Sequence, residues 1–431
     1  MMPRHKRRNG RRRYRLNPKL LPTAGLTLLA VGMVVVVFMM LMPGGSISVF
    51  NQPTPTPTAQ PTAEPTEVPT QAPTPTPQIY NEVRVRAAGD IMVHDDELLS
   101  AKQDDGSYDF TSFFGEIADS LGDADYTMAN LETTVGEAGS KGYTGYPNFH
   151  TPTSLLTALK GTGIDMLTTS NNHCLDRYFD GLVETLDSLD AAGFDHTGTF
   201  RNKQEYQTAY VKEVNGIKIG VVAYTYGTNG MEEDSDPDGV EWGIMYLSNA
   251  NFEKSAQRLR EAGAEVLIAV PHWGTEYKRA PDDSTVDYAK EMAKAGFDVI
   301  IGSHPHMVQP IEWLETTRAD GSTGRTLVAY SLGNFVSAQR DQYKDTGIIL
   351  DFTIRQEIAT GDITIEDVGY VPVWVWRYED GDKNAYRVLP CGAALDALPE
   401  GMSDADQARL SAAWSETLEL MTADGITALK K

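Results

Sequence analysis

Two stretches of sequence decide the fold: residues 266–274, VLIAVPHWG, and residues 297–306, FDVIIGSHPH. In each, a short apolar run rich in β-branched residues ends at Gly or Pro, a pattern typical of a buried parallel strand. His272, His304 and His306 follow these runs. Open α/β sheets bind ligands at the carboxyl ends of their strands, and neutral imidazole is a good metal ligand. The alternative is that these are loop histidines that bond only to backbone.

Three strand-like runs further upstream also end in polar residues. They are residues 83–90 (VRVRAAGD), which end at Asp90, residues 126–132 (YTMANLE), which end at Glu132, and residues 164–173 (IDMLTTSNNH), which end at Asn172 and His173. Carboxylates are hard oxygen donors of the kind that divalent metals prefer. Because five polar clusters share predicted strand ends, we expect one ligand site. A purely structural set of polar residues is the alternative.

Strand and helix patterns alternate through the rest of the chain, which predicts an α/β fold. Further strand patterns cover residues 217–224 and 327–331, and helical patterns cover 111–121, 154–160, 178–192, 251–262 and 285–295. After residue 346 strand patterns dominate (348–354, 363–368, 371–376), which either extend the sheet or form a second one. Residues 403–420 predict a terminal amphipathic helix, with Leu410, Trp414 and Leu418 on one face.

The N-terminal region predicts a membrane anchor. Residues 1–23 carry nine Lys or Arg and no acid, and residues 24–42 form an uncharged apolar segment. This segment is close to the ~20 residues that cross a bilayer as a helix. The basic flank should stay cytoplasmic, which predicts a single-pass protein of the cell membrane whose C-terminal domain is extracytoplasmic. A cleaved signal peptide is the alternative, although its apolar core is usually about 7–15 residues long.

Composition sets the remaining boundaries. Residues 43–78 form a Pro/Thr-rich linker, which favours extended polyproline conformations. Residues 79–400 form a large globular domain, and residues 401–431 form a C-terminal helical segment. Nine of the 37 basic residues and two of the 60 acidic residues precede residue 79, which leaves 28 against 58, a balance of −30. This charge argues against nucleic acid as a partner. We expect Cys174 and Cys391 to be two free thiols rather than a disulfide.

Six motifs, in order, resemble those of CapA-type poly-γ-glutamate capsule biosynthesis proteins. They are GDIM at 89–92, NLE at 130–132, NNH at 171–173, HWG at 272–274, GSHPH at 302–306 and SLGNF at 331–335. The resemblance runs from about residue 83 to residue 377. It implies an α/β fold similar to calcineurin-like metallophosphoesterases, a four-layer sandwich of two facing sheets flanked by helices, after an N-terminal transmembrane helix. The anchored, outward-facing layout also resembles that family.

The resemblance also implies the cofactor, one or two divalent metal ions (Mn, Mg, Zn or Fe). The implied ligands are Asp90 and His306 for a first metal, Asn172, His272 and His304 for a second, and Glu132 as a bridge between the two. His173 resembles the catalytic histidine that protonates a leaving group or steadies transition-state charge. Residues 331–335 would shape the floor of the pocket.

One position departs from the phosphoesterase pattern. Phosphoesterases usually carry a His two residues after the first Asp, and this chain has Met92 there. A thioether is a poor ligand for Mg²⁺ or Mn²⁺. His94 has the same strand parity but lies one step further along, so its position alone does not assign it as a substitute ligand. The first metal would then be held weakly, or a single metal would bind.

Three functions compete at this point. The first is a metal-dependent hydrolase or transferase of cell-surface polymer chemistry. The second is a non-catalytic component that binds or exports an anionic polymer, poly-γ-glutamate, together with membrane subunits of a capsule synthase. The third is an extracellular phosphoesterase unrelated to capsule, against which Met92 counts. A shared fold alone does not decide between them.

Overall fold

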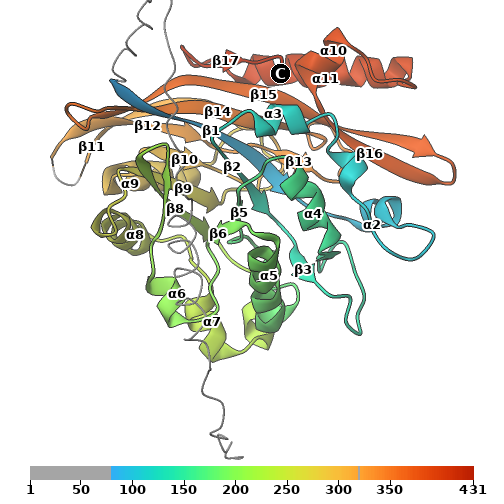
Figure 1. Cartoon of the computed structure of the whole chain (residues 1–431), viewed down its shortest axis with the longest axis horizontal. Coiled ribbons are helices and arrows are strands. Elements are labelled where there is room, and N and C mark those ends of the chain that lie inside the picture. The colour runs from blue at the N-terminus through green and yellow to red at the C-terminus, as the bar shows by residue number, and fades with distance from the viewer. Residues whose placement is uncertain (1–78, 319–320) are drawn as a thin grey trace, which may run out of the picture. The chain divides into compact units, whose positions relative to one another are not determined.

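The structure, a computed structural model, describes residues 79–318 and 321–431 (Figure 1). The predicted cytoplasmic segment 1–23, membrane helix 24–42 and linker 43–78 lie outside the described residues. Within the part that is described, no helix is both long and apolar enough to cross a membrane. The membrane anchor therefore stays a prediction from sequence.

A nine-stranded mixed sheet contains the first strand of the domain. Its order is β16-β15-β14-β1-β2-β5-β6, with β13 beside β1 and β17 beside β15. Its strands are β1 (Tyr80–Ile91), β2 (Tyr126–Leu131), β5 (Met166–Thr168), β6 (Asp195–Thr197), β13 (Asn334–Val336), β14 (Thr346–Glu357), β15 (Ile363–Asp380), β16 (Lys383–Pro390) and β17 (Thr427–Ala428). β1, β2, β5 and β6 are parallel, and β14, β15 and β16 continue the sheet in antiparallel order. The strands after residue 346 therefore extend this sheet.

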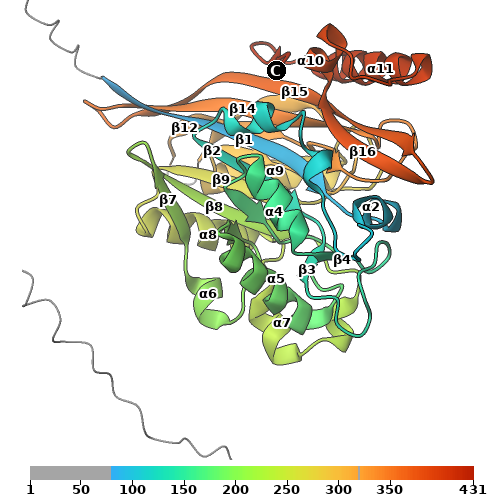
Figure 2. The same cartoon turned by 45° about the vertical axis from the view of Figure 1, so that its right-hand side comes forward.

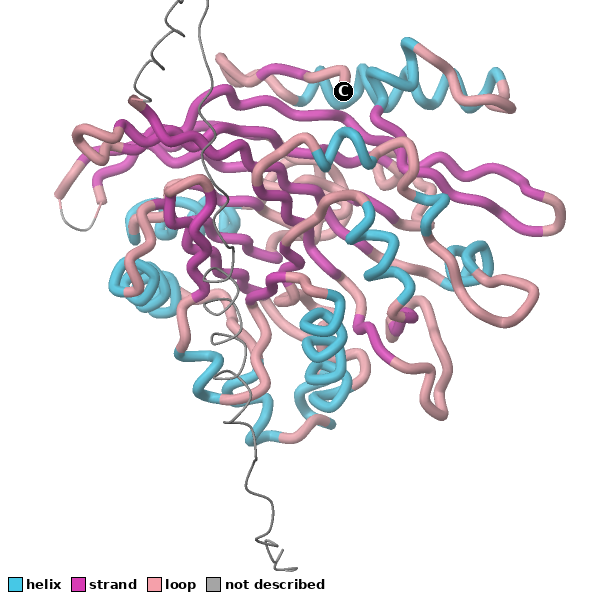
Figure 3. The backbone as a smooth tube through the Cα atoms, viewed as in Figure 1, coloured by secondary structure: helices cyan, strands magenta, loops and turns pink. Residues whose placement is uncertain are grey.

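A six-stranded sheet forms the second layer of strands (Figure 3). Its strands are, in the order β11-β12-β10-β9-β8-β7, β11 (Ile311–Thr317), β12 (Thr323–Ala329), β10 (Val299–Ile301), β9 (Val266–His272), β8 (Ile217–Thr225) and β7 (Tyr210–Val214). The four central strands are parallel, and an antiparallel strand closes each edge. A separate pair joins β3 (Thr134–Gly136) to β4 (His150–Pro152).

The two sheets face each other across an apolar core. Along β1, Val83, Val85 and Ala87 alternate with polar residues, so they share one face of the strand. This face packs with Val221 and Ile268 of the other sheet in one buried cluster. Burying a valine or isoleucine side chain completely contributes roughly 1.5–3 kcal/mol. The alternation that predicts a strand therefore also holds the two sheets together.

Helices cover the outer faces of both sheets (Figure 2). α4 and α5 pack on the nine-stranded sheet, α8 and α9 pack on the six-stranded sheet, and α11 packs beside β15. The helices are α2 (Asp95–Ala101), α3 (Ala118–Gly122), α4 (Ser154–Gly161), α5 (Tyr178–Ala192), α6 (Lys203–Gln207), α7 (Pro237–Gly243), α8 (Asn249–Glu261), α9 (Asp283–Ala295), α10 (Cys391–Asp396) and α11 (Asp404–Leu420), with 3₁₀ turns η1 (Thr111–Phe113) and η2 (Met231–Asp234). Along α5, Leu182, Leu186 and Leu189 form the buried stripe.

The structure differs from the predicted elements in three places. The single helix predicted over residues 111–121 is wrong, because the chain forms η1 and then α3 around the buried Phe113 and Phe114. The patterns at 363–368 and 371–376 belong to one strand, β15, and the terminal segment contains β17 after its helix. The expectation of free thiols is confirmed: Cys174 and Cys391 are buried and unpaired.

Candidate metal centre

The polar residues predicted to form a site converge at strand ends of both sheets. They are Asp90 near the end of β1, Glu132 directly after β2, Asn172 and His173 after β5, His272 at the end of β9, and His304 and His306 after β10. All seven are buried. Because the strands that carry them are parallel within each sheet, their carboxyl ends meet at one edge of the sandwich.

Two glycines let the strands approach closely beside the site. A Cβ atom on Gly89 would lie 2.0 Å from the carbonyl oxygen of Gly333, and one on Gly302 would lie 2.0 Å from that of Tyr330. Only glycine tolerates so close an approach. Because Gly89 has no side chain, the next residue, Asp90, can donate its backbone N–H to Gly333 O at 3.0 Å. These glycines therefore place the residues that follow them.

The backbone of the GSHPH motif adopts an unusual conformation. His304 has φ of 97° and His306 has φ of 54°, a backbone region that residues other than Gly rarely occupy. Such residues cost of order 1–3 kcal/mol each and persist where the surroundings demand them. The imidazole centroids of these two residues lie 5.7 Å apart. The strained loop thus delivers two imidazoles to the same cluster.

Glu132 lies at the centre of this cluster. Its Oε1 atom is 3.4 Å from Nε2 of His272 and 3.8 Å from Nε2 of His306. Possible ligand atoms of Glu132, His304 and His306 all lie within 4.8 Å of one another, and the same holds for Asp90, Glu132 and His272. The two groups share Glu132, the residue that the resemblance places between two metals. The assignment of the other ligands to individual metals stays a prediction.

The donors present fit a divalent metal. Both oxygens of Glu132 are buried without a hydrogen-bond partner among the described residues, and Nδ1 of His304 also has none. A buried carboxylate without a donor is costly, so native structures satisfy such groups with protein, water or ions. Imidazole nitrogens suit Zn and Fe, whereas carboxylate and amide oxygens suit Mg and Mn. The mixed set of donors is therefore compatible with each of the predicted ions.

Strong electrostatic interactions link the buried groups of the metal-free protein. Burial opposes ionisation of Glu132, but His272 and His306 outweigh it and lower the pKa of Glu132 to about 2. Burial also disfavours the proton of His306, yet Glu132 and Asp90 raise the pKa of His306 to about 9. Burial and the neighbouring His272 lower the pKa of His304 to about 2. A metal would therefore displace a proton from the cluster on binding.

Two polar residues orient the His272 side of the cluster. Oγ of Ser303 lies 2.9 Å from Nδ1 of His272, which leaves Nε2 facing the amide oxygen of Asn172 at 2.7 Å. Asn229 accepts a hydrogen bond from Nδ2 of Asn172 at 3.3 Å, which points the oxygen of Asn172 inward. Sequence reasoning did not single out Asn229, because 57 residues separate it from Asn172.

Two asparagines of the recognised motifs orient the opposite side. Asn130 donates to Oδ1 of Asp90 at 2.9 Å. Nδ1 of His306 lies 3.1 Å from Oδ1 of Asn334 and 3.2 Å from Oδ2 of Asp90. Partners of this kind fix the ring and direct its other nitrogen toward a metal. Asn334 belongs to the SLGNF motif, so this motif orients a predicted ligand, and its role in shaping the pocket floor stays a prediction.

His173 forms a buried pair with Asp176. Its Nδ1 atom lies 2.8 Å from Oδ2 of Asp176, which also accepts the backbone N–H of Phe149. Burial lowers the pKa of His173, but the hydrogen bond to Asp176 outweighs burial and raises it. The sequence signal for Asp176 was its spacing of three residues from His173, which sequence reasoning did not use. Within the described part of the chain, Nε2 of His173 has no hydrogen-bond partner.

Two residues after Asp90, Met92 is buried, and His94 belongs to neither group of possible ligand atoms. Nδ1 of His94 lies 3.3 Å from Oε2 of Glu97, and its ring packs edge-on against Phe149. His94 therefore takes part in the start of α2.

Two exposed tyrosines flank the buried cluster on its solvent side. The ring centroid of Tyr226 lies 4.7 Å from that of His304, and the ring centroid of Tyr277 lies 6.0 Å from that of His306. Tyr226 is 48% exposed and Tyr277 is 40% exposed, so both reach from the ligand rings to solvent. We call these two tyrosines the mouth of the candidate site.

The fold and the site define the class: this is an α/β protein with a buried cluster of histidines and carboxylates, suited to binding a metal, at its strand ends. The sequence profile of the family described as "Bacterial capsule synthesis protein PGA_cap" matches residues 84–339, more than half of the chain. The protein therefore belongs to this family. Its matched region includes every residue of the candidate site.

Two relatives from Bacillus share the same region. The chain is 26% identical over 273 residues to "Capsule biosynthesis protein CapA" of Bacillus anthracis, covering 61% of each chain. It is 28% identical over 229 residues to "PGA biosynthesis protein CapA" of Bacillus subtilis (strain 168), covering 50% of this chain and 54% of that protein. The matches thus span less than two thirds of either relative.

Solved structures show more distant similarity. NAD nucleotidase (NadN) of Haemophilus influenzae is 13% identical, with a TM-score of 0.43, and the match covers 81% of this chain and 58% of that one. The calcineurin-like phosphoesterase YfkN of Bacillus subtilis is 12% identical, with a TM-score of 0.38, and the match covers 79% of this chain and 98% of that one. Similarity at this level says nothing about activity.

Proposed function

We propose that this protein is a membrane-anchored, extracytoplasmic component of poly-γ-glutamate capsule synthesis that acts as a metal-dependent hydrolase. The observation that carries the proposal is the buried carboxylate of Glu132, which faces His272 and His306 and has no hydrogen-bond partner among the described residues. Family membership and the names of the Bacillus relatives support the polymer as substrate. The basic segment 1–23 and the apolar segment 24–42 support the anchor.

The layer order of helices, sheet, sheet and helices supports a four-layer fold of the metallophosphoesterase type. The residues that would hold one or two divalent ions are Asp90, Glu132, Asn172, His272, His304 and His306. When bound, such an ion supplies Lewis-acid activation of a carbonyl or phosphoryl group. His173 holds a proton at Nε2, oriented by Asp176 at Nδ1, and donates it to the leaving group. Membrane subunits of a capsule synthase are the expected partners.

A second candidate function is a non-catalytic component that binds or exports the same polymer. The observation that favours it is Met92, which occupies the position where phosphoesterases usually carry a metal-binding His. With one ligand fewer, the site would hold a metal that organises the polymer or the protein. This candidate keeps the requirement for Glu132 but removes the requirement for His173.

The two candidates differ in what His173→Ala should do. If the protein is a hydrolase, the loss of a positioned acid lowers the rate on the order of 10²–10⁴-fold, at unchanged metal content. The experiment measures polymer output of cells that carry His173→Ala or Glu132→Ala, and the metal content of each purified full-length variant. Normal polymer with His173→Ala, at intact metal content, eliminates the catalytic role. A wild-type protein without bound metal eliminates both candidates.

A further inference from the structure

A cluster of arginines lines a cavity next to the mouth of the metal site. This cavity, of about 510 Å³, lies between the loop 337–345, β15 and α11, and Arg340, Arg377 and Arg409 line it. We propose that it is a second anion-binding subsite, which holds a carboxylate of a polyanionic chain while a neighbouring segment of that chain occupies the metal site. The inference rests on the proposed function and adds the path of the polymer.

The charge of the protein makes such a cluster informative. From residue 79 on, acidic residues outnumber basic ones by 30. The overall field therefore repels an anionic chain, and a local group of cations is needed to receive it. Guanidinium groups are well suited, because their planar donors match carboxylates in a bidentate geometry.

Acidic side chains of the cavity already have partners. Asp345 accepts hydrogen bonds from Arg409 at 2.7 and 3.0 Å and from Nε1 of Trp374 at 2.8 Å. Glu416 accepts from Arg409 at 3.0 Å and from Gln342 at 3.0 Å. Asp406, the third acid that lines the cavity, accepts a hydrogen bond from the hydroxyl of Ser403, the residue directly before α11. The two side chains thereby cap the start of this helix. Asp345 and Glu416 therefore compensate Arg409, whereas Asp406 bonds to a hydroxyl and not to a cation.

Arg377 and Arg340 have no carboxylate within ion-pair distance in the described part of the chain. Arg377 is exposed on β15 and lines the cavity. Arg340 donates to three backbone carbonyls, those of Ser337, Ala338 and Val375. These bonds use three of its five N–H groups. Arg377 is therefore available to an anion that enters the cavity, and Arg340, which is half-buried and lies over the ring of Tyr386 at 5.8 Å, adds its positive charge from the wall.

Contacts connect the mouth of the metal site to this cavity. The ring of Tyr277 lies beside that of His306, and Nζ of Lys344 lies 3.6 Å from the centroid of the Tyr277 ring. Two residues further along, Arg279 donates to the backbone oxygen of Glu416 in α11 at 2.6 Å. The segments 277–279 and 342–345 therefore run from the metal site to the wall of the cavity, with basic residues along them.

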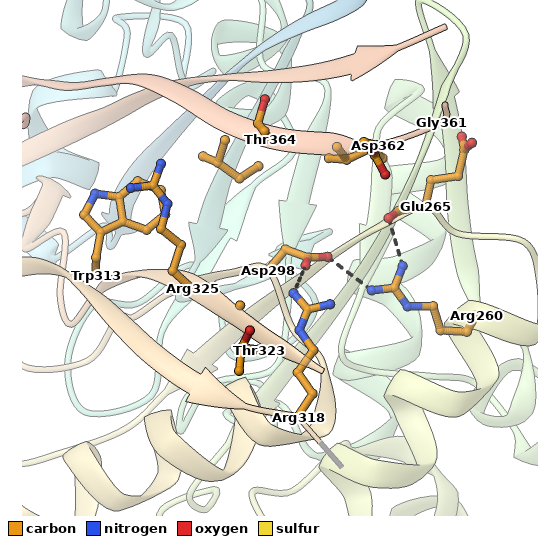
Figure 4. Close-up of a pocket in the computed structure, with 13 residues that line it drawn as sticks. Arg260, Glu265, Asp298, Trp313, Arg318, Thr323, Arg325, Gly361, Asp362 and Thr364 are labelled. Atoms are coloured by element: carbon orange, nitrogen blue, oxygen red, sulfur yellow. Dashed lines mark hydrogen bonds and ion pairs between the residues drawn. The ribbon is translucent and has the colours of Figure 1, made fainter. Parts of the chain in front are cut away.

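A different arginine-lined cavity provides a matched control. It has a volume of about 640 Å³ and lies at the amino ends of β9, β10 and β12, away from the metal site (Figure 4). There Asp298 pairs with Arg260 at 3.3 Å and with Arg318 at 2.6 Å, while the guanidinium of Arg325 stacks on Trp313 at 4.1 Å. Arg325 is exposed, as Arg377 is, so the two positions carry the same charge in different places.

The experiment measures how binding affinity depends on the length of the oligomer and on the position of the substituted arginine. Binding of a γ-glutamyl dipeptide and of γ-glutamyl oligomers of about ten residues is measured on the metal-loaded full-length protein, because a second contact on one chain raises avidity. Wild type should bind the longer oligomer more tightly than the dipeptide. Arg377→Glu should weaken the longer oligomer on the order of tenfold and leave the dipeptide unchanged. Arg325→Glu should change neither, and Arg377→Gln should show a smaller loss.

The outcomes separate the subsite from the function. Wild type that binds neither ligand contradicts the proposed function and the subsite with it. If wild type binds both the dipeptide and the longer oligomer, and Arg377→Glu does not change the affinity for either, the proposed function stands and the subsite is overturned. An equal loss in Arg325→Glu and Arg377→Glu also overturns it, since the effect would then come from overall charge. Metal content and thermal unfolding of each variant verify that the fold is intact.

Discussion

Arg86 and Glu132 are both charged and completely buried, yet their surroundings differ. Arg86, in the middle of β1, donates to Oδ2 of Asp351 at 2.8 Å and to the backbone oxygen of Ser120 at 2.7 Å. Glu132, just beyond the end of β2, finds no donor among the described residues for either of its oxygens. One charge is compensated by the fold itself, whereas the other is surrounded by imidazoles that could share a metal with it.

This difference separates structural charges from functional ones. The charge of Arg86 is compensated within the protein by its hydrogen-bonded partner Asp351, although Nη2 of Arg86 has no hydrogen bond and lies 3.7 Å from Oδ2 of Asp123. The cost of such a pair appears when one partner is removed. A buried carboxylate without a donor is incomplete, and native proteins rarely retain such a group without a reason. Because both residues stand in similar β-strand sequences, burial and charge alone would not tell them apart. What separates them is the hydrogen-bonded counter-ion, which Arg86 has in Asp351 and Glu132 lacks among the described residues.

The largest expected effect on stability comes from breaking the compensated pair. Arg86→Met leaves Asp351 buried with less compensation, and the cost should fall at the lower end of about 3–5 kcal/mol, because Arg84 still donates to Asp351. Metal content should not change. Denaturant unfolding of the full-length protein measures the loss. Arg84→Met is the matched control and should cost under about 1 kcal/mol, since Arg84 is partly exposed.

The second prediction concerns the incomplete charge. Glu132→Gln removes the anionic donor shared by both groups of possible ligands, so metal affinity should fall by about 100-fold or more. Titration with Mn²⁺ or Zn²⁺ and elemental analysis measure this loss. A chelator should lower the thermal stability of wild type but not that of the variant, because a metal that binds only the native state stabilises it. Unchanged metal content in Glu132→Gln would refute the role assigned to Glu132.

The fold class and the position of the site could be predicted from sequence because both depend on local patterns. Apolar runs at 266–270 and 299–301 are strands in the structure, and the polar residues that follow them converge at one edge. Where apolar residues packed without regular periodicity, prediction failed. Phe113 and Phe114 are buried in a turn, and the pattern around them imitates a continuous helix.

The partners of the site residues depend on tertiary structure and were mostly beyond sequence reasoning. Ser303 lies within a recognised motif, but nothing in that motif states that its hydroxyl meets His272. Asn229 reaches Asn172 only because the loop after β8 folds over the end of β5. The missing donors of Glu132 likewise follow from three-dimensional packing. Sequence thus predicts which residues meet, and structure shows which of them lack partners.

The smallest expected effect tests whether such a partner matters. Asn229 has φ of 53° and accepts a hydrogen bond from Asn172, so substitution by Ala would combine backbone strain with loss of the contact. Asn229→Gly keeps the left-handed backbone and removes only the side chain. Without the acceptor, the amide of Asn172 is free to rotate, and metal affinity should fall by about tenfold, as for other residues that orient ligands. Asn229→Asp keeps an acceptor oxygen and should restore most of the affinity in the same metal titration.

If Asn229→Gly binds metal as tightly as wild type, Asn172 either needs no orientation or does not bind the metal. Asn172→Ala then distinguishes the two, because only a ligand would lower affinity when it is removed.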